Sequence, residues 1–486
     1  MIRPHRLHHV LALAFAAAVV SACDISGVGD GSKPEKLEIV RNPNTDLIDL
    51  GGDVEQYFLC FPEQLQAVVT FSNGGIDSSG LLNQRVLWST SDPAVVEVSN
   101  AAATGGEVVL IPGSETQAFS PGILVPRGVG TAKITAEFIG LSASYDVEVR
   151  EVDSVQINKT EVKVAPETGD LLTLTAVIDG YSLDVTQSPL WQFDTDDEDV
   201  DDIATIGQST GVITGVGLGG PLTAKADFPL CREDSKFGDL TATVVVEELT
   251  GLQIAREFAD APNDELIVGT TEKLTVTGSF ADGTTLDLSG QVRVESSEVE
   301  VVAPGTVFPQ FLTALEAGTA QLQAIYGGDD ENDEEGDTDP PEVRSNTITL
   351  NTVDGELQDF DITPLNPTIT TLGVQQFVAT GTFSVSGETR TQPITRGVVW
   401  AESTLDDKAT TLVDISNSSL SAGRAVSRSI DAGAFKITAS RKLPSDDEEE
   451  EDDDNELVRE TVLCVVKPNT PGAPCPPPDE DDETAP

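Results

Sequence analysis

Two short patterns recur four times, in the same order, along this chain. The first is an apolar residue, any residue and an isoleucine, and it returns at intervals of about 100 residues. These triplets are Leu37–Ile39, Val155–Ile157, Leu252–Ile254 and Phe360–Ile362. The second is a short segment that opens with glycine, at Gly130, Gly220, Gly318 and Gly433. Both patterns alternate apolar and polar residues with a period of two, which is typical of half-buried β-strands. The sequence therefore predicts an array of four β units.

The length of each unit predicts its fold class. Each unit ends in a further alternating strand, and turns rich in Gly, Asp, Asn and Pro separate short strands over about 100 residues, as in immunoglobulin-like (Ig-like) sandwiches. We therefore predict an all-β chain of tandem Ig-like β-sandwich domains in an extended array. The predicted domains are residues 35–150, 151–248, 249–353 and 354–467. Only a few residues join consecutive units, which favours an extended row over loosely tethered domains.

The N-terminus has the features of an export signal. The apolar run Val10–Val20 follows a basic stretch and is too short to span a bilayer. The sequence from Val20 to Cys23 then resembles the lipobox of bacterial lipoproteins, which implies cleavage after residue 22 and acylation of Cys23. Residues 23–34 would form a tether, and the chain would be exported and anchored to a bacterial membrane, in a leaflet left open. The alternative is an ordinary signal peptide with a chance cysteine.

A second resemblance concerns the repeated units. Trp88–Val98, with the sequence WSTSDPAVVEV, followed by GTAKITA, resembles the group 2 bacterial Ig-like domain, as does TGVITGV at Thr210–Val216. Trp191 and Trp400 occupy the matching tryptophan position in units two and four, and Val294 replaces it in unit three. The resemblance implies that these residues fill the core and that the glycines make turns. It implies a module and not a target.

Charge and histidine content restrict the possible functions. The chain has 28 basic and 83 acidic residues, a net charge of −55, and such a surface repels the phosphates of nucleic acids. The histidines all precede Cys23: His5, His8 and His9. Once the leader is removed, neither a histidine-dependent catalytic triad nor a histidine-ligated zinc site remains. We therefore expect no nucleic-acid partner and no enzymatic activity, with carboxylate-only hydrolysis as the remaining catalytic alternative.

Four further cysteines suggest disulfides. In an Ig-like sandwich, Cys60 would lie between the first and second strands of unit one, and Cys231 in the loop before the last strand of unit two. Both should face the same joint, so we predict a Cys60–Cys231 bond that locks the first two domains. Cys464 would then pair with Cys475 in the tail. Unpaired thiols are the alternative, because sequence alone fixes no distances.

Runs of acidic residues lie in the predicted loops before the last strands of units three and four. One run is similar to an EF-hand loop in having Gly336 at its sixth position and a glutamate at its twelfth. Its candidate calcium ligands are Glu331, Asp333, Glu335, Asp337 and Glu342. The alternative is a solvated acidic loop without bound Ca²⁺. The tail, residues 468–486, is rich in proline and acids and is predicted to be disordered.

These features together predict a lipid-anchored structural or adhesive stalk of the cell envelope that catalyses no reaction. The alternative is a binding module for a surface polysaccharide or a protein partner. The tryptophans look internal, which lowers the support for an aromatic sugar-binding surface.

Overall fold

The computed structural model describes residues 32–41, 55–100, 121–195, 199–228, 231, 237–257, 265–328, 340–428, 432–443 and 456–467. The leader, Cys23 and the tail at 468–486 lie outside these residues, so what the sequence predicts for them stays a prediction. Within the described ranges, no helix has the length and apolar character needed to cross a membrane.

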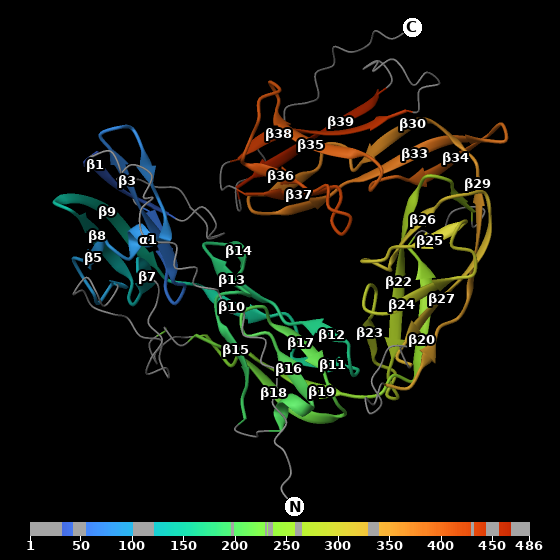
Figure 1. Cartoon of the computed structure of the whole chain (residues 1–486), viewed down its shortest axis with the longest axis horizontal. Coiled ribbons are helices and arrows are strands. Elements are labelled where there is room, and N and C mark those ends of the chain that lie inside the picture. Colours follow the sequence, from blue (N-terminus) through green and yellow to red (C-terminus); the bar gives the residue numbers. More distant parts are fainter. Residues whose placement is uncertain are drawn as a thin grey trace, which may run out of the picture. The chain divides into compact units, whose positions relative to one another are not determined.

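The described residues form mainly β-strands (Figure 1). Their ten sheets fall into four groups that follow one another in the sequence, here named sandwich 1 (34–150), sandwich 2 (154–246), sandwich 3 (251–353) and sandwich 4 (356–466). The short helices among these residues are α1 (Gly80–Asn83) and the 3-10 helix η2 (Val200–Asp202). This architecture confirms the predicted all-β fold of tandem Ig-like sandwiches.

By its internal contacts the chain divides into two compact units. The first holds the described residues within 1–46 and 62–147, and the second holds those within 47–61 and 148–486. Most of sandwich 1 forms the first unit, and sandwiches 2 to 4 belong to the second. The segment around Cys60 also belongs to the second unit.

Sandwich 1 is built from two sheets. Its strands are β1 (Pro34–Arg41), β2 (Glu55–Phe58), β3 (Glu63–Phe71), β4 (Ile76–Asp77), β5 (Leu87–Thr90), β6 (Val96–Val98), β7 (Ile123–Pro126), β8 (Gly130–Phe138) and β9 (Leu141–Arg150). One sheet has the order β1-β3-β7-β6, with β4 beside β3, and the other has the order β2-β9-β8-β5.

Sandwich 2 contains three smaller sheets, of order β10-β13-β14, β11-β19-β18-β15 and β12-β17-β16. Its strands are β10 (Ser154–Ile157), β11 (Glu161–Val164), β12 (Gly169–Leu171), β13 (Leu174–Ile178), β14 (Tyr181–Asp184), β15 (Leu190–Phe193), β16 (Ala204–Ile206), β17 (Val212–Gly215), β18 (Gly219–Asp227) and β19 (Thr241–Val246).

Sandwich 3 contains two sheets, of order β20-β22-β26-β25 with β23 beside β22, and β21-β29-β27-β24 with β28 beside β27. Its strands are β20 (Gly251–Arg256), β21 (Glu265–Ile267), β22 (Thr271–Ser279), β23 (Thr285–Asp287), β24 (Arg293–Ser296), β25 (Val302–Pro304), β26 (Phe311–Ala314), β27 (Gly318–Tyr326), β28 (Val343–Arg344) and β29 (Ile348–Val353).

Sandwich 4 again contains three sheets, of order β30-β33-β34, β31-β39-β38-β35 and β32-β37-β36. Its strands are β30 (Glu356–Thr363), β31 (Thr368–Thr370), β32 (Val374–Gln376), β33 (Val378–Val385), β34 (Glu388–Pro393), β35 (Val399–Thr404), β36 (Val413–Ile415), β37 (Arg424–Ser427), β38 (Gly433–Lys442) and β39 (Glu456–Val466).

The repeated sequence patterns correspond to the same strands in each sandwich. The isoleucine triplets lie in the opening strands β1, β10, β20 and β30, and the glycine-led segments lie in β8, β18, β27 and β38. The glycine-led strand pairs with the closing strand of its sandwich, for example β27 with β29 and β38 with β39. In sandwiches 2 to 4 a short strand runs parallel to that closing strand: β11 with β19, β21 with β29 and β31 with β39.

The tryptophans lie in the cores, as the resemblance implied. Trp88, Trp191 and Trp400 are all buried, and so is Val294 at the matching position of sandwich 3. Gly211 allows this packing in sandwich 2, because it has a φ of +68° and a Cβ there would lie 2.4 Å from the carbonyl oxygen of Leu172. Glycine is the residue that adopts this left-handed conformation without strain.

Candidate functional site

The joints between sandwiches are short. Three residues, 151–153, separate β9 from β10; four, 247–250, separate β19 from β20; and two, 354–355, separate β29 from β30. Within the second unit, so few residues hold sandwiches 2 and 3, and sandwiches 3 and 4, within reach of each other's side chains. The joints of the second unit are therefore the places where contacts between sandwiches can set the mechanical behaviour of the chain.

The segment before β3 is bonded covalently to sandwich 2 within the second unit. The structure contains the predicted disulfide between Cys60 and Cys231, with a Cα–Cα distance of 4.8 Å, and Cys60 is only 3% exposed. Next to the bond, the Phe61 ring packs edge-on against Phe228 at 5.5 Å between centroids and lies 6.1 Å from Phe237. The bond is thus flanked by an apolar cluster that forms part of the hydrophobic core of the second unit.

Cys464 is also disulfide-bonded. Its predicted partner, Cys475, lies outside the described residues. The Cys464–Cys475 pairing therefore stays a prediction.

A lysine links sandwiches 2 and 3. Lys163 in β11 places its Nζ 2.6 Å from Asp282 Oδ2 and 3.1 Å from Glu247 Oε2, and 5.4 Å from the ring centroid of Phe280. The turn between β22 and β23 holds Asp282 in place, because its Oδ1 accepts a hydrogen bond from the backbone N–H of Thr284. The hydrogen bond between the two side chains raises the pKa of Lys163 and lowers the pKa of Asp282 well below its usual range. Both shifts favour the charged pair.

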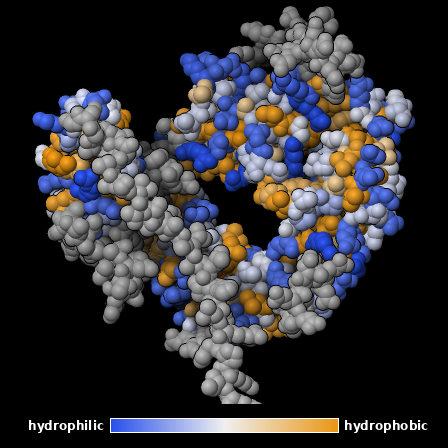
Figure 2. Space-filling model, in the orientation of Figure 1, coloured by the Kyte–Doolittle hydropathy of each residue, from blue (hydrophilic) through white to orange (hydrophobic). Residues whose placement is uncertain are grey.

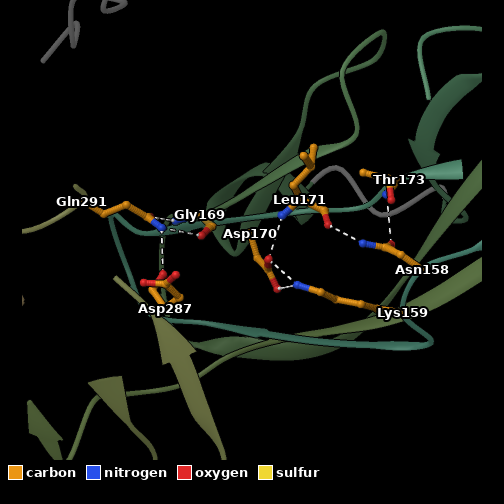
Figure 3. Close-up of polar contacts among 8 residues, drawn as sticks. All are labelled: Asn158, Lys159, Gly169, Asp170, Leu171, Thr173, Asp287 and Gln291. Atoms are coloured by element: carbon orange, nitrogen blue, oxygen red, sulfur yellow. Dashed lines mark hydrogen bonds and ion pairs between the residues drawn. The ribbon is translucent and has the colours of Figure 1, made fainter. Parts of the chain in front are cut away.

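Two neutral side chains, Gln291 and Tyr326, bond the same joint, and Figure 3 shows the contacts of Gln291. The Gln291 amide accepts a hydrogen bond from Gly169 N at 2.6 Å and donates to Gly169 O at 3.0 Å, and it also donates to Asp287 O at 3.1 Å. At the end of β27, the Tyr326 hydroxyl donates to Pro166 O at 2.8 Å. Burial raises the pKa of Tyr326, so the hydroxyl keeps its proton as a donor. Backbone groups of sandwich 2 are thus bonded by side chains of sandwich 3.

A buried glutamine links sandwiches 3 and 4 through side-chain hydrogen bonds, as Gln291 links sandwiches 2 and 3. Gln392 in β34 is 9% exposed; its Oε1 accepts a hydrogen bond from Ile267 N at 2.9 Å, and its Nε2 donates to Thr270 Oγ1. The Ile267 side chain is part of the hydrophobic core of sandwich 4. This joint therefore combines a buried polar contact with an apolar one.

Two arginines of sandwich 4 contact acids of sandwich 3. Arg390 forms an ion pair with Glu265. Arg396 lies 3.7 Å from Glu257 through Nη1 and Oε2, and its guanidinium stacks 4.4 Å from the centroid of the Phe311 ring. Burial lowers the pKa of Arg396, while Glu257 acts in the opposite direction. Some of the few cations of this acidic chain are thus used at its joints.

Sandwich 3 also carries a groove of about 620 Å³. Its lining contains a single carboxylate, that of Glu295, which lies 3.5 Å from both Arg293 and Arg344. The paired carboxylates that glycoside hydrolysis requires are therefore not found among its lining residues. Val299 in the lining is exposed, and so is Val307, which follows the lining residue Thr306. Over the visible face of the molecule, hydrophilic and hydrophobic side chains are interspersed (Figure 2).

The predicted calcium site falls largely outside the description. Glu331, Asp333, Glu335 and Asp337 are not among the described residues. Glu342 is described and pairs with Arg344 at 2.6 Å, and the hydrogen bond to Arg344 lowers the pKa of Glu342. Across the described ranges, no group of three His, Cys, Asp or Glu side chains is arranged to hold a metal ion. Calcium binding stays a prediction.

Sequence reasoning missed the polar contacts of the joints. A period-two pattern marks which strand residues point inward, but it does not reveal which side chains reach a neighbouring sandwich. The scarcity of basic residues was the available signal. In a chain with 28 cations and 83 acids, Lys163, Arg390 and Arg396 could have been singled out.

Comparison with known proteins finds distant similarity. No family model matches the sequence. The chain is 23% identical over 457 residues to Ice-binding protein 1 of Shewanella frigidimarina (strain NCIMB 400), in an alignment that covers 78% of this chain and 45% of that protein. The chain thus spans less than half the length of this relative.

The similar solved structures are multidomain β proteins. They include domains 4–9 of the surface layer protein SbsC, at 14% identity and a TM-score of 0.20, with 89% of this chain and 66% of that chain covered. The bacterial protein invasin matches at 11% identity and a TM-score of 0.16, with coverages of 88% and 79%. Since these TM-scores are below 0.5, the fold assignment rests on the strands and sheets described above.

Proposed function

We propose that this chain is a lipid-anchored, non-catalytic spacer of the bacterial cell envelope, in which Ig-like sandwiches hold a distal part away from the membrane. The observation that carries the proposal is the construction of the joints. Each joint has two to four residues, and in the second unit side chains of one sandwich bond backbone or acidic groups of the next. Such contacts stiffen a row of domains.

The absence of a histidine after Cys23 supports a non-catalytic role. The groove on sandwich 3 supports it further, because its charged residues, Arg293 and Glu295, are paired with each other and offer no second carboxylate for acid–base work.

Solution scattering tests the spacer. The glycine-led strands have nine or ten residues, so a sandwich is about 30–40 Å long and four in a row span about 150 Å, with a radius of gyration of about 40 Å. A compact particle with the same number of residues has a radius of gyration of about 23 Å. We expect a value near the larger figure. A value near the smaller one would contradict the proposal.

A matched variant tests the joints themselves. This variant combines three substitutions that remove joint contacts and leave the chain length unchanged: Lys163→Met, Gln291→Ala and Gln392→Ala. We expect each sandwich to stay folded and the distribution of interatomic distances obtained from solution scattering to broaden. An unchanged distribution would show that these contacts do not stiffen the chain.

Metabolic labelling tests the anchor. In a bacterial host, labelled palmitate is expected to attach to the wild-type chain and not to the Cys23→Ser variant. Label that is absent from both would refute the anchor. Two acyl chains or more would give stable membrane attachment.

A second candidate function is that of a binding module. Two observations favour it: the similarity to Ice-binding protein 1 and the groove on sandwich 3. The alignment leaves more than half of the relative unmatched, so its ice binding need not reside in the matched part. Ice-recrystallisation and glycan-array assays on this chain test the candidate. Activity in either would favour a binding module, and a groove variant such as Arg293→Ala would locate it.

A further inference from the structure

We infer that the Cys60–Cys231 bond is a covalent load path, which removes the residues between the two cysteines from the line of tension when the chain is pulled end to end. The inference rests on the proposed spacer function, because a spacer between a membrane and a distal load bears tension. It follows from covalent connectivity and does not depend on how the two units are placed.

The bond closes a loop of the chain. Its cysteines are 171 residues apart in sequence and their Cα atoms are 4.8 Å apart. Strands β3 to β18 lie within this loop. Once β1 has separated from β3, and β19 from β11 and β18, force that enters at Cys60 passes through the two sulfur atoms to Cys231 and bypasses the loop. Of the described strands, seven in sandwich 1 and nine in sandwich 2 are therefore shielded from extension.

Sandwich 3 differs in this respect. Residues 251–353 contain no cysteine, so the backbone of sandwich 3 must carry the full load. Its short strand β21 pairs in parallel with the closing strand β29, from Glu265 opposite Asn351 to Ile267 opposite Val353. Once tension has separated β20 from β22, it shears the hydrogen bonds between β21 and β29 together. The chain thus places a load-bearing sandwich after a covalently shielded region.

The surroundings of the bond bury one of its two cysteines. Cys60 and Phe61 are buried, and Phe61, Phe228 and Phe237 form an aromatic cluster beside the sulfurs. Reduction needs a thiolate to reach one sulfur atom of the bond. Burial of Cys60 hinders attack at its own sulfur, whereas Cys231 is only partly buried, so an attacking thiolate has access from the Cys231 side.

Single-molecule stretching tests the inference. The chain from Asp24 to Pro486, with a coupling handle at each end, is extended without reductant until no further unfolding step occurs. A small dithiol is then added; it attacks one sulfur, leaves as a cyclic disulfide and converts the two cysteines to thiols. We expect one long further step of about 600 Å, from 171 residues at about 3.6 Å each.

Two variants serve as controls. Cys60→Ser with Cys231→Ser should reach the full length before the dithiol is added. Cys464→Ser with Cys475→Ser should keep the long step, because the predicted pair of those cysteines hides only about 40 Å of chain.

Wild-type chain that shows only the short step, or none, would overturn the inference, even if scattering finds an extended particle. Chain that shows the long step but takes up no palmitate would keep the load path and refute the proposed anchor. The two proposals can therefore fail separately.

Discussion

Replacing Gln392 with leucine tests whether a buried hydrogen bond holds sandwiches 3 and 4 together. Leucine has a similar volume but neither accepts a hydrogen bond from Ile267 N nor donates one to Thr270 Oγ1. The Thr270 hydroxyl keeps a partner, because it also donates to Ile267 O at 2.6 Å. The main loss is therefore the acceptor for the Ile267 N–H.

The size of the effect follows from burial. Ile267 is 3% exposed and Gln392 is 9% exposed, so leucine leaves a donor without a partner in a site that water does not reach. Such a donor costs about 1–3 kcal/mol. Gln392→Ala leaves space for a water molecule that can accept the bond, so we expect the cost of this variant to be near the lower end, about 1 kcal/mol.

Amide hydrogen exchange measures this cost locally, without requiring two-state unfolding of a multidomain chain. Since about 1.4 kcal/mol corresponds to a factor of ten, the Ile267 amide should exchange roughly 5- to 150-fold faster in the leucine variant. The neighbouring Val268 amide, which donates to Val353 O, should also lose protection if the joint opens. Wild-type exchange at both amides would refute the reasoning.

Gln291→Leu is the matched control. Gln291 also bonds backbone of a neighbouring sandwich, through Gly169, but its side chain is exposed. Water can replace its hydrogen bonds, so we expect a loss of under about 1 kcal/mol at the Gly169 amide. Equal losses from Gln392→Leu and Gln291→Leu would show that burial does not set the strength of the contact.

Three further predictions concern charged and titrating groups. Arg256→Met leaves the buried carboxylate of Glu272 without its arginine, so it should lower the free energy of unfolding of sandwich 3 in denaturant by about 3–5 kcal/mol. The double variant Arg256→Met with Glu272→Leu should be close to wild type. Equal losses of stability in the two variants would contradict this prediction. The raised pKa of Tyr326 contributes stability that is fully present below about pH 10, the unfolded value, and is lost as pH rises further. Tyr326→Phe should therefore flatten the alkaline end of the stability curve, and an unchanged slope would refute the assignment. The lowered pKa of Asp282 contributes stability that is present above about pH 4 and is lost as pH falls through the pKa of the folded state. Asp282→Asn should therefore make the thermal unfolding temperature depend less on pH in acid. A variant with the wild-type pH dependence would show that the ion pair between Asp282 and Lys163 contributes nothing to stability.

The repeated strands of each sandwich could be predicted from the sequence because burial alternates along a strand. The glycine-led strand of sandwich 3 begins at Gly318 in both the pattern and the structure, and Trp191 is buried as its position implied. The Cys60–Cys231 bond was also predictable, since the order of strands in the fold brings the two loops to one end of sandwich 2. These features depend on periodicity and topology, which a sequence displays directly.

The joint contacts could not be predicted in the same way. Gln392 lies in a strand whose alternation is ordinary, and it reaches Ile267 only because of how sandwiches 3 and 4 are oriented. That orientation follows from the packing of complete surfaces, including Ile267 against the core of sandwich 4. No local pattern encodes it.

One recurring ion pair was visible in the sequence but was overlooked. The residue two positions after the recurring isoleucine is basic in the first three sandwiches, and in each it forms an ion pair with an acid. In sandwiches 1 and 3 this acid lies two positions before the residue that faces the basic one across the sheet, Leu65 or Leu274. The pairs are Arg41–Glu63, Lys159–Asp170 and Arg256–Glu272. The first and third are the more deeply buried, and Figure 3 shows the second.

Sandwich 4 departs from this arrangement at both positions at once. Pro364 lies two positions after its isoleucine, Ile362. Extending the register of β30 with β33 by one pair beyond Thr363 and Val378 puts Gln375 where the acid would lie. A buried charge that loses its partner costs several kcal/mol, whereas replacing both partners costs little. A sequence with a charge at only one of the two positions would therefore be less stable than a sequence with both charges or with neither. The joint absence of both charges in sandwich 4, beside their joint presence in sandwiches 1 and 3, where the pair is buried, is what this energetic asymmetry predicts.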